Sequence, residues 1–497
     1  MQHFTELCVL FLMILTPVLS NKPTGDVDVL VFLPQNNSFM FSQARVAPAI
    51  RYAQERLEAE FGLRFRVHFE NTDPANQALF ALADRSCGPR PDLILGPVRE
   101  YEAAGVVRLA SHWNIPVISA GALAIAFRNK RSEYTQLTRI APSYMKMAET
   151  FAVVFEHFAW KSALLLMEDD MTERDCYFTL EAVFHLMDDY TVKTYSFPPE
   201  EPLRTDEMFQ DIHDTEVVIM CAGADRVREI MLAAHKRQLT NGSCMFFNVD
   251  LFNASSYGNG SWQRGDEYDD DARKAYSSLN TVTLLKTVKP EYENFSVEMR
   301  KSMERVGLYD CSDCGNVNMF LEGFHDAMLL YAIALHEALK NGYNKKNGTE
   351  ITSHMWNRTF EGIAGQVSID VNGDRNGDFS LMAMTNVEAG SYEVVANYFG
   401  VNKTFQLLSA FDSRRFTVKG RQEVNQELPQ TSCELGVSAL TGVTVGALLG
   451  AVMLVAFYFF RKNYRITIQR RSRADEPYCG KHHQLREDSI KSHFSAA

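Results

Sequence analysis

Few residues in the chain have the spacing of a reactive site. Cys311 and Cys314 are separated by two residues, which is the spacing of a redox dithiol and of half a zinc site. No second cysteine pair and no histidine pair lies nearby in the sequence. In the oxidising compartment indicated below, a local disulfide or two separate structural bridges is the favoured interpretation.

The acidic segment DVNGDRNGD, residues 370–378, has the composition of a calcium-binding loop. Aligning Gly377 with the sixth position of such a loop places Ala383 at the twelfth, where a bidentate glutamate is required. The segment is therefore predicted to be a turn. The chain also has no G-x-S-x-G, Walker or H-E-x-x-H motif. We predict a protein that is not an enzyme, with no catalytic or metal-binding residues.

Two apolar segments indicate a secreted and membrane-anchored chain. Residues 8–19 form a run of twelve residues, too short to span a bilayer but typical of a signal peptide, which we place at residues 1–20. Residues 435–460 contain no charge over 26 positions, and Arg461 and Lys462 follow at once. This pattern predicts one transmembrane helix with its C-terminal side in the cytoplasm.

The charge distribution agrees with this topology. Residues 461–497 contain nine Lys or Arg and four Asp or Glu, a net charge of +5, against −12 for the whole chain, so residues 1–460 carry −17. The predicted outside is acidic, which favours cationic partners and excludes nucleic acid as a partner. We expect a single-pass plasma-membrane protein with an extracellular N-terminus and a cytoplasmic tail at residues 461–497.

Glycosylation motifs and cysteines support an extracellular location for residues 21–434. Eight N-x-S/T motifs all precede the transmembrane segment, at Asn36, Asn241, Asn253, Asn259, Asn294, Asn347, Asn357 and Asn402. Seven cysteines lie in the same region, at Cys87, Cys176, Cys221, Cys244, Cys311, Cys314 and Cys433. Because seven is odd, at least one of them is free or bridges two chains.

The extracellular region alternates short apolar runs with amphipathic segments. Expected strands are 27–34, 65–70, 92–97, 116–120, 163–167, 216–221, 245–249, 366–370, 379–384 and 392–398. Expected helices are 44–60, 76–84, 101–113, 175–187, 224–236 and 317–339. Continuous apolar strands alternating with helices predict an α/β fold of two lobes with doubly wound parallel sheets. In such folds ligands bind at the carboxyl ends of the strands or between the lobes.

We place the first lobe at about 26–145 with 320–360, the second at about 146–319 with 361–400, and a polar stalk at 401–434.

In the transmembrane segment, Gly442, Gly446 and Gly450 recur every four residues, with Ser438 before them. Such a stripe of small residues lets two helices approach closely, so with Cys433 just outside the membrane it indicates a homodimer and an interchain disulfide. Composition alone is the alternative explanation of the stripe.

The chain resembles the natriuretic peptide receptors, most closely their clearance (type C) members. The stretches that carry the resemblance are LPQNNSFMFSQARVAPAI, PDLILGPVREYEAA, LASHWNIPVISAGALA, SEYTQLTRIAPSYMKM, CYFTLEAVF, FHDAMLLYAIALHEAL and FYFFRKNYRITI. They extend from the extracellular region into the tail. Cyclase-type members of the family continue for hundreds of residues after the membrane, whereas this sequence continues for 37.

The resemblance implies a periplasmic-binding-protein-like ectodomain that forms a homodimer around one natriuretic peptide, internalises and clears the hormone, and couples through its tail to an inhibitory G protein. The hormone-binding residues it implies are Tyr101, Arg108, Glu133, Tyr134, Tyr177, Phe178 and Phe197. It also implies a Cys176–Cys221 disulfide and a chloride site at Ser42, Val98 and Arg99. A receptor guanylyl cyclase and a binding module for small metabolites are the alternative functions.

The sequence departs from the family at three positions. Family members have a disulfide whose cysteines correspond to Pro74 and Arg99, so this bridge is absent, and Arg99 changes the chemistry of the implied chloride site. A hormone-contacting tyrosine of the type C receptor corresponds to Met167. The resemblance gives no partner for Cys87, Cys244, Cys311 or Cys314.

Overall fold

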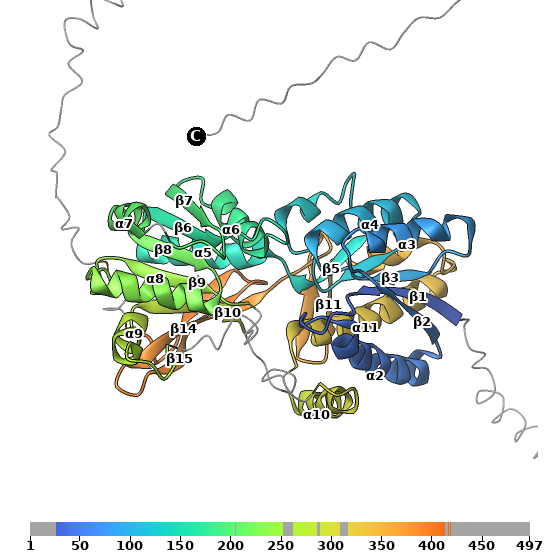
Figure 1. Cartoon of the computed structure of the whole chain (residues 1–497). Helices are drawn as coiled ribbons and strands as arrows, with labels where there is room; N and C mark the ends of the chain where they lie inside the picture. The colour runs from blue at the N-terminus through green and yellow to red at the C-terminus, as the bar shows by residue number, and fades with distance from the viewer. Residues whose placement is uncertain are drawn as a thin grey trace, which may run out of the picture. The chain divides into compact units, whose positions relative to one another are not determined.

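The computed structural model describes residues 26–203, 205–251, 262–285, 289–308, 317–412, 416 and 418. Within these residues the chain forms two lobes, each built on one eight-stranded sheet with helices on both faces (Figure 1). The predicted two-lobed α/β class is therefore correct.

The sheet of the first lobe has the strand order β11-β12-β13-β5-β4-β3-β1-β2. Its strands are β1 (Asp26–Leu33), β2 (Arg64–Asn71), β3 (Leu93–Leu95), β4 (Val117–Ser119), β5 (Leu137–Pro142), β11 (Arg358–Glu361), β12 (Gln366–Ile369) and β13 (Asp374–Arg375). Strands β1 to β5 pair in parallel. The central strands β3, β4 and β5 are buried throughout because helices cover both faces, which explains their unbroken apolar sequences.

Helices cover the two faces of this sheet unequally. One face packs against α2 (Gln43–Phe61), α10 (Pro290–Arg305), α11 (Met319–Lys340) and α12 (Gly348–Met355). The other packs against α3 (Gln77–Asp84), α4 (Glu100–His112) and the short helix η2 (Ile125–Arg128), while η1 (Arg85–Cys87) follows α3 (Figure 1).

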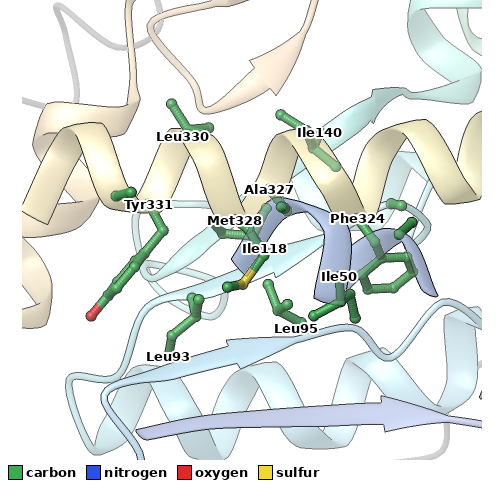
Figure 2. Close-up of a cluster of buried hydrophobic side chains, with 14 of the residues drawn as sticks. Ile50, Leu93, Leu95, Ile118, Ile140, Phe324, Ala327, Met328, Leu330 and Tyr331 are labelled. Atoms are coloured by element: carbon green, nitrogen blue, oxygen red, sulfur yellow. The ribbon is translucent and has the colours of Figure 1, made fainter. Parts of the chain in front are cut away.

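Helix α11 is the centre of the first core. Its N-terminus is capped by Asn318, whose side chain accepts hydrogen bonds from the N–H groups of Phe320 and Leu321. Apolar residues one helical turn apart then face the sheet and α2, as Figure 2 shows for Phe324, Ala327, Met328 and Tyr331 against Ile50, Leu93, Leu95 and Ile118. Gly323 is required by this packing, since a Cβ there would lie 2.9 Å from the Cβ of Ala120.

The second lobe repeats the plan with the strand order β16-β15-β14-β10-β9-β8-β6-β7. Its strands are β6 (Ser162–Glu168), β7 (Thr191–Phe197), β8 (Val217–Cys221), β9 (Met245–Val249), β10 (Leu279–Leu284), β14 (Asp378–Asn386), β15 (Ser391–Phe399) and β16 (Thr404–Leu407). Helices α5 (Tyr144–Phe158) and α6 (Asp175–Leu186) cover one face. Helices α7 (Thr205–His213), α8 (Ala224–Lys236) and α9 (Asp269–Tyr276) cover the other.

The acidic segment 370–378 forms a turn at residues 371–373 that leads into strand β13, and two of its carboxylates pair with cationic side chains. The fully buried Arg139 donates from Nε and Nη2 to the two carboxylate oxygens of Asp374, at 2.7 and 2.8 Å. Lys130 lies 3.1 Å from Asp374, and Lys146 lies 3.0 Å from Asp370. Burial alone would raise the pKa of Asp374, but Arg139 and Lys130 hold it well below its ordinary value. These ion pairs use the oxygens that a calcium ion would need.

The predicted lobe boundaries need two corrections. Helix α10 packs on α2 and contributes to the core of the first lobe, so the first crossing from the second lobe precedes residue 290 rather than residue 320. Strands β12 and β13 belong to the first sheet, so the return to the second lobe follows residue 375 rather than residue 360. The predicted stalk also begins later, because β16 pairs with β15.

Several predicted features lie outside the described residues. They are the signal peptide, the transmembrane segment with its glycine stripe, the tail, and Cys311, Cys314 and Cys433. No helix among the described residues is both long and apolar enough to cross a membrane.

Candidate functional site: a charged and aromatic surface along α4 and α6

Three of the predicted hormone-binding residues meet at the outer face of α4. Nη2 of Arg108 lies 2.6 Å from Oε2 of Glu133, and the two side chains are 51% and 43% exposed. The guanidinium of Arg108 lies 5.0 Å from the ring centre of Tyr134. Tyr134 is buried against Phe127, with ring centres 4.8 Å apart. The result is an exposed ion pair above a fixed aromatic ring.

Three more of these residues form an aromatic cluster that joins the lobes. Tyr101 of α4 is 50% exposed, and its ring centre lies 5.8 Å from that of Phe178 in α6. Tyr177 lies 5.5 Å from Phe178 by the same measure, and the guanidinium of Arg174 lies 4.0 Å from the ring of Tyr177. Because α4 belongs to the first lobe and α6 to the second, this surface is made by both lobes.

Phe197 does not join either group through its side chain. It is the last residue of β7 and is 4% exposed in the core beneath α7 and α8. Met167 is also buried, in the core beneath α5 and α6. A peptide on the surface formed by α4 and α6 would therefore meet Tyr101 and Arg108 before it could reach either of these residues.

A disulfide fixes the beginning of α6. Cys176 and Cys221 are bonded, with their Cα atoms 5.2 Å apart and a sequence separation of 45. The bond ties the first turn of α6 to the end of β8, directly before Tyr177 and Phe178. Such a crosslink restricts the positions that these two aromatic residues can take. Of the other cysteines in the described residues, Cys87 is free and exposed, and Cys244 is free and buried.

Arg99, immediately before α4, is the centre of a second charged group. Its guanidinium pairs with Glu102, with Asp73 at 3.0 Å and with Glu173 at 2.9 Å. Glu173 precedes α6 in the second lobe, so this Arg99 cluster (Arg99, Asp73, Glu102 and Glu173) is an ionic contact between the lobes. Arg99 and Glu102 are 10% and 1% exposed, unlike the pair at Arg108.

The carboxyl groups around the Arg99 cluster have unusual proton affinities. Burial raises the pKa of Glu100 to about 8, and Asp175 adds to this shift. Burial also raises the pKa of Glu102 to about 7, although Arg99 opposes the change. The carboxylate of Glu100 accepts hydrogen bonds from the N–H groups of Leu123 and Ala124. Acidic groups are thus concentrated where the lobes meet.

Comparison of the sequence with known proteins identifies the family of this chain. The family model "Receptor family ligand binding region" matches residues 45–387. Atrial natriuretic peptide receptor 3 of Rattus norvegicus is 52% identical over 95% of this chain and 91% of its own length. The chain belongs to the natriuretic peptide receptor family.

More distant similarities are consistent with this family. Atrial natriuretic peptide receptor 2 of Rattus norvegicus is 31% identical over 77% of this chain but only 38% of its own length. The leucine binding protein LivK of Thermotoga maritima matches with a TM-score of 0.53 and 15% identity, over 76% of this chain and 99% of LivK. The match to LivK supports the periplasmic-binding-protein-like fold alone.

The chloride site implied for this receptor family can be tested against the residues present. Ser42 is fully buried, and its hydroxyl has no hydrogen-bond partner in the described part of the chain, so it can donate to an anion. Val98 is buried as well. The Arg99 side chain is already engaged by three carboxylates. The hydroxyl therefore fits a chloride site, whereas the guanidinium does not contribute to one.

The predicted glycosylation residues of this family member lie at the surface where they are described. Asn36, Asn241, Asn294, Asn357 and Asn402 are exposed. Asn347 is half-buried and caps α12 by accepting a hydrogen bond from the N–H of Glu350. Asn253 and Asn259 lie outside the described residues.

Sequence reasoning missed the second lobe's contribution to the Arg99 cluster. Glu173 is 74 residues from Arg99 in sequence, and it belongs to an acidic loop that looks like any solvated surface. It also missed Arg174, which pairs with Asp169 and lies over Tyr177. The one local signal was that Arg174 lies three residues before the aromatic Tyr177 at the expected start of a helix, a spacing at which a cation can lie over an aromatic ring.

Proposed function

We propose that this chain is a non-enzymatic cell-surface receptor that binds natriuretic peptides on the surface formed by α4 and α6 and clears them by internalisation. The observation that carries the proposal is the aromatic group of the exposed Tyr101 and the half-buried Phe178 and Tyr177, on the same surface as the Arg108–Glu133 pair. Aromatic side chains provide large, rigid contact area for a peptide. The 52% identity to atrial natriuretic peptide receptor 3 of Rattus norvegicus supports the choice of hormone.

The Arg108–Glu133 pair supplies the charge selectivity in this proposal. Both side chains are about half exposed, so each can exchange its partner for a charged group of a peptide at little cost. Glu133 would then accept hydrogen bonds from an arginine of the hormone, the geometry that carboxylates bind best. The acidic extracellular region would favour the approach of such a cationic peptide.

The test is binding of labelled atrial natriuretic peptide to cells that express the full chain. Tyr101→Ala is expected to weaken binding by at least about tenfold, because central aromatic residues at interfaces often contribute 2 kcal/mol or more. Tyr268→Ala is the matched control, since Tyr268 is a 52% exposed tyrosine at the start of α9 in the second lobe. Equal losses in the two variants, or no binding by wild type, would contradict the proposal.

We further propose a homodimer that holds one peptide between two copies. Phe80 is 56% exposed on α3, the helix that packs beside α4, which supports an apolar contact with a second copy there. Cys433 would form the interchain disulfide. Non-reducing gels are expected to show a dimer for wild type and a monomer for Cys433→Ser. A wild type that migrates as a monomer would refute the covalent link.

Chloride and an inhibitory G protein are the remaining proposed partners. Chloride would be held by the Ser42 hydroxyl and the backbone at Val98 and Arg99, and replacing chloride with gluconate is expected to weaken hormone binding. The basic residues Arg470, Arg471 and Arg473 would contact the G protein. Their replacement by Gln should abolish hormone-dependent inhibition of adenylyl cyclase while hormone uptake persists; undiminished inhibition would exclude this contact.

A further inference from the structure

A concave site lies in the second lobe, and the first turn of α6 contributes Asp175 and Cys176 to its lining. A cavity of about 690 Å³ opens at the carboxyl ends of β6, β8 and β9, and Glu168, Gly223 and Asp250 mark those three ends in its lining. This edge of a parallel sheet is where α/β folds hold ligands. The volume is that of a site for a small organic molecule.

The lining has the composition of a site for a cation. It contains four carboxylates and, among the described residues, no Lys, Arg or His. The acidic residues are Glu168, Asp170, Asp175 and Asp250. The lining also contains aromatic and apolar side chains, namely Trp262, Tyr276, Tyr392, Leu279 and Met382. Carboxylates beside aromatic faces attract a positively charged group that carries an apolar body.

Two carboxylates of the lining already accept hydrogen bonds from backbone N–H groups, whereas the carboxylate of Asp175 does not. Oε2 of Glu168 accepts the N–H of Gly223 at 2.6 Å and so occupies the N-terminus of α8, which would otherwise attract an anionic ligand. Oδ1 of Asp170 accepts three N–H groups of residues 172–174. Asp175 has no hydrogen-bond or ion-pair partner for its carboxylate within the described residues, and it faces the cavity.

An unsatisfied acceptor gives an independent indication of a ligand. Asn248 is the fourth residue of β9 and lines the cavity. Its Oδ1 atom is buried and has no hydrogen-bond partner in the described part of the chain. A buried acceptor without a donor is unfavourable, so this oxygen is suited to a donor that a ligand supplies.

We propose that this cavity binds a small protonated arylalkylamine, with its ammonium group paired to Asp175 and its ring packed against Trp262, Tyr276 and Tyr392. A second donor on the ring of the ligand would bond to Asn248. Desolvation by the surrounding protein raises the pKa of Asp175 to about 6, and the nearby carboxylates of Glu173 and Asp170 add to this shift while Arg99 opposes it. A bound ammonium relieves this repulsion between carboxylates.

Tryptamine is a suitable probe because it has an ammonium group, an aromatic ring and a ring N–H donor. Isothermal titration of the full-length protein at pH 7.5 would compare it with indole-3-propionate, which has a similar shape and the opposite charge. Tryptamine is expected to bind at least about tenfold more tightly, the effect of one charge-assisted hydrogen bond. Equal affinities, or no tryptamine binding at about 1 mM, would overturn the proposal.

Two variants locate the site. Asp175→Asn is expected to reduce tryptamine affinity at least about tenfold, whereas Asp214→Asn, an exposed acid of the same lobe beside His213, should have no effect. Asn248→Leu should weaken tryptamine binding without lowering the melting temperature, because it removes a buried acceptor oxygen that has no donor in the described part of the chain. If neither Asp175→Asn nor Asn248→Leu changes tryptamine affinity, or if Asp214→Asn reduces it equally, the assignment is wrong.

Discussion

Two arginine–glutamate pairs lie along α4, one at each end, and they differ in almost everything except their chemistry. Arg99 and Glu102 are 10% and 1% exposed, and Arg99 also reaches Asp73 and, across the lobes, Glu173. Arg108 and Glu133 are 51% and 43% exposed. The side chains of the first pair are almost completely shielded from water, whereas those of the second pair remain about half exposed.

This difference assigns different tasks to the two pairs. A buried charge that loses its partner has no water to replace it, so the Arg99 cluster is suited to holding one arrangement of the lobes. An exposed pair is worth little because water and salt compete with it, so Arg108 and Glu133 can exchange partners when a charged ligand arrives. The same side-chain chemistry thus contributes to structure at one end of α4 and to proposed recognition at the other.

The largest effect is expected from Arg99→Ala. At pH 8 this change leaves Glu102 buried without its cation, so the free energy of unfolding should fall by about 3 kcal/mol. Urea unfolding followed by tryptophan fluorescence would measure it. The double variant Arg99→Met with Glu102→Leu should recover most of the loss, since it removes both charges. A double variant as unstable as the single one would show that packing, rather than charge, governs this position.

A smaller effect is expected from pH. The pKa of Glu100 is raised from 4.5 to about 8 and that of Glu102 to about 7, with burial as the main cause. The folded protein therefore holds protons that the unfolded chain releases above pH 4.5, so their stabilising contribution is complete below pH 4.5 and is lost as the pH rises through 7 and 8.

Thermal melting should detect this dependence. The melting temperature of wild type is expected to fall by about 5 °C between pH 5.5 and pH 8. Glu100→Gln, which cannot ionise, should show a clearly smaller decrease over the same range. A variant with the wild-type slope would mean that other groups determine the response to pH.

The smallest effect on stability is expected from Arg108→Ala. Because this ion pair is exposed, its loss should change the free energy of unfolding by less than about 0.5 kcal/mol, while binding of labelled natriuretic peptide decreases. Urea unfolding and peptide binding on the same preparation would measure both quantities. A loss of stability as large as that of Arg99→Ala would remove the distinction between the two pairs.

Local periodicity was sufficient to predict most of the elements. The helix expected at 224–236 and the strand expected at 245–249 have those bounds in the structure. The strand expected at 92–97 is observed at Leu93–Leu95, shortened by the Gly-Pro that follows it. Buried strands and amphipathic helices differ in the spacing of their apolar residues, and this spacing is written in neighbouring positions of the chain.

The sequence did not predict which lobe each late element joins. Strand β13 has two residues, too few for any periodicity, yet it carries the Asp374 that accepts the buried Arg139 from 235 residues away. Helix α10 has an ordinary amphipathic pattern, which identifies the face that it buries but not the partner against which that face packs.

The stretches that resemble the natriuretic peptide receptors determined that this chain belongs with receptors, and the resemblance implied which side chains were candidates for contact with a peptide. Only the tertiary structure decided that Arg108 pairs with Glu133, that Arg99 reaches Glu173 across the lobes, and that Phe197 is buried. The reason is that charge and aromatic character belong to single residues, whereas pairing and exposure depend on how segments far apart in sequence are brought together. Water is excluded from one end of α4 and admitted at the other only once both lobes have folded.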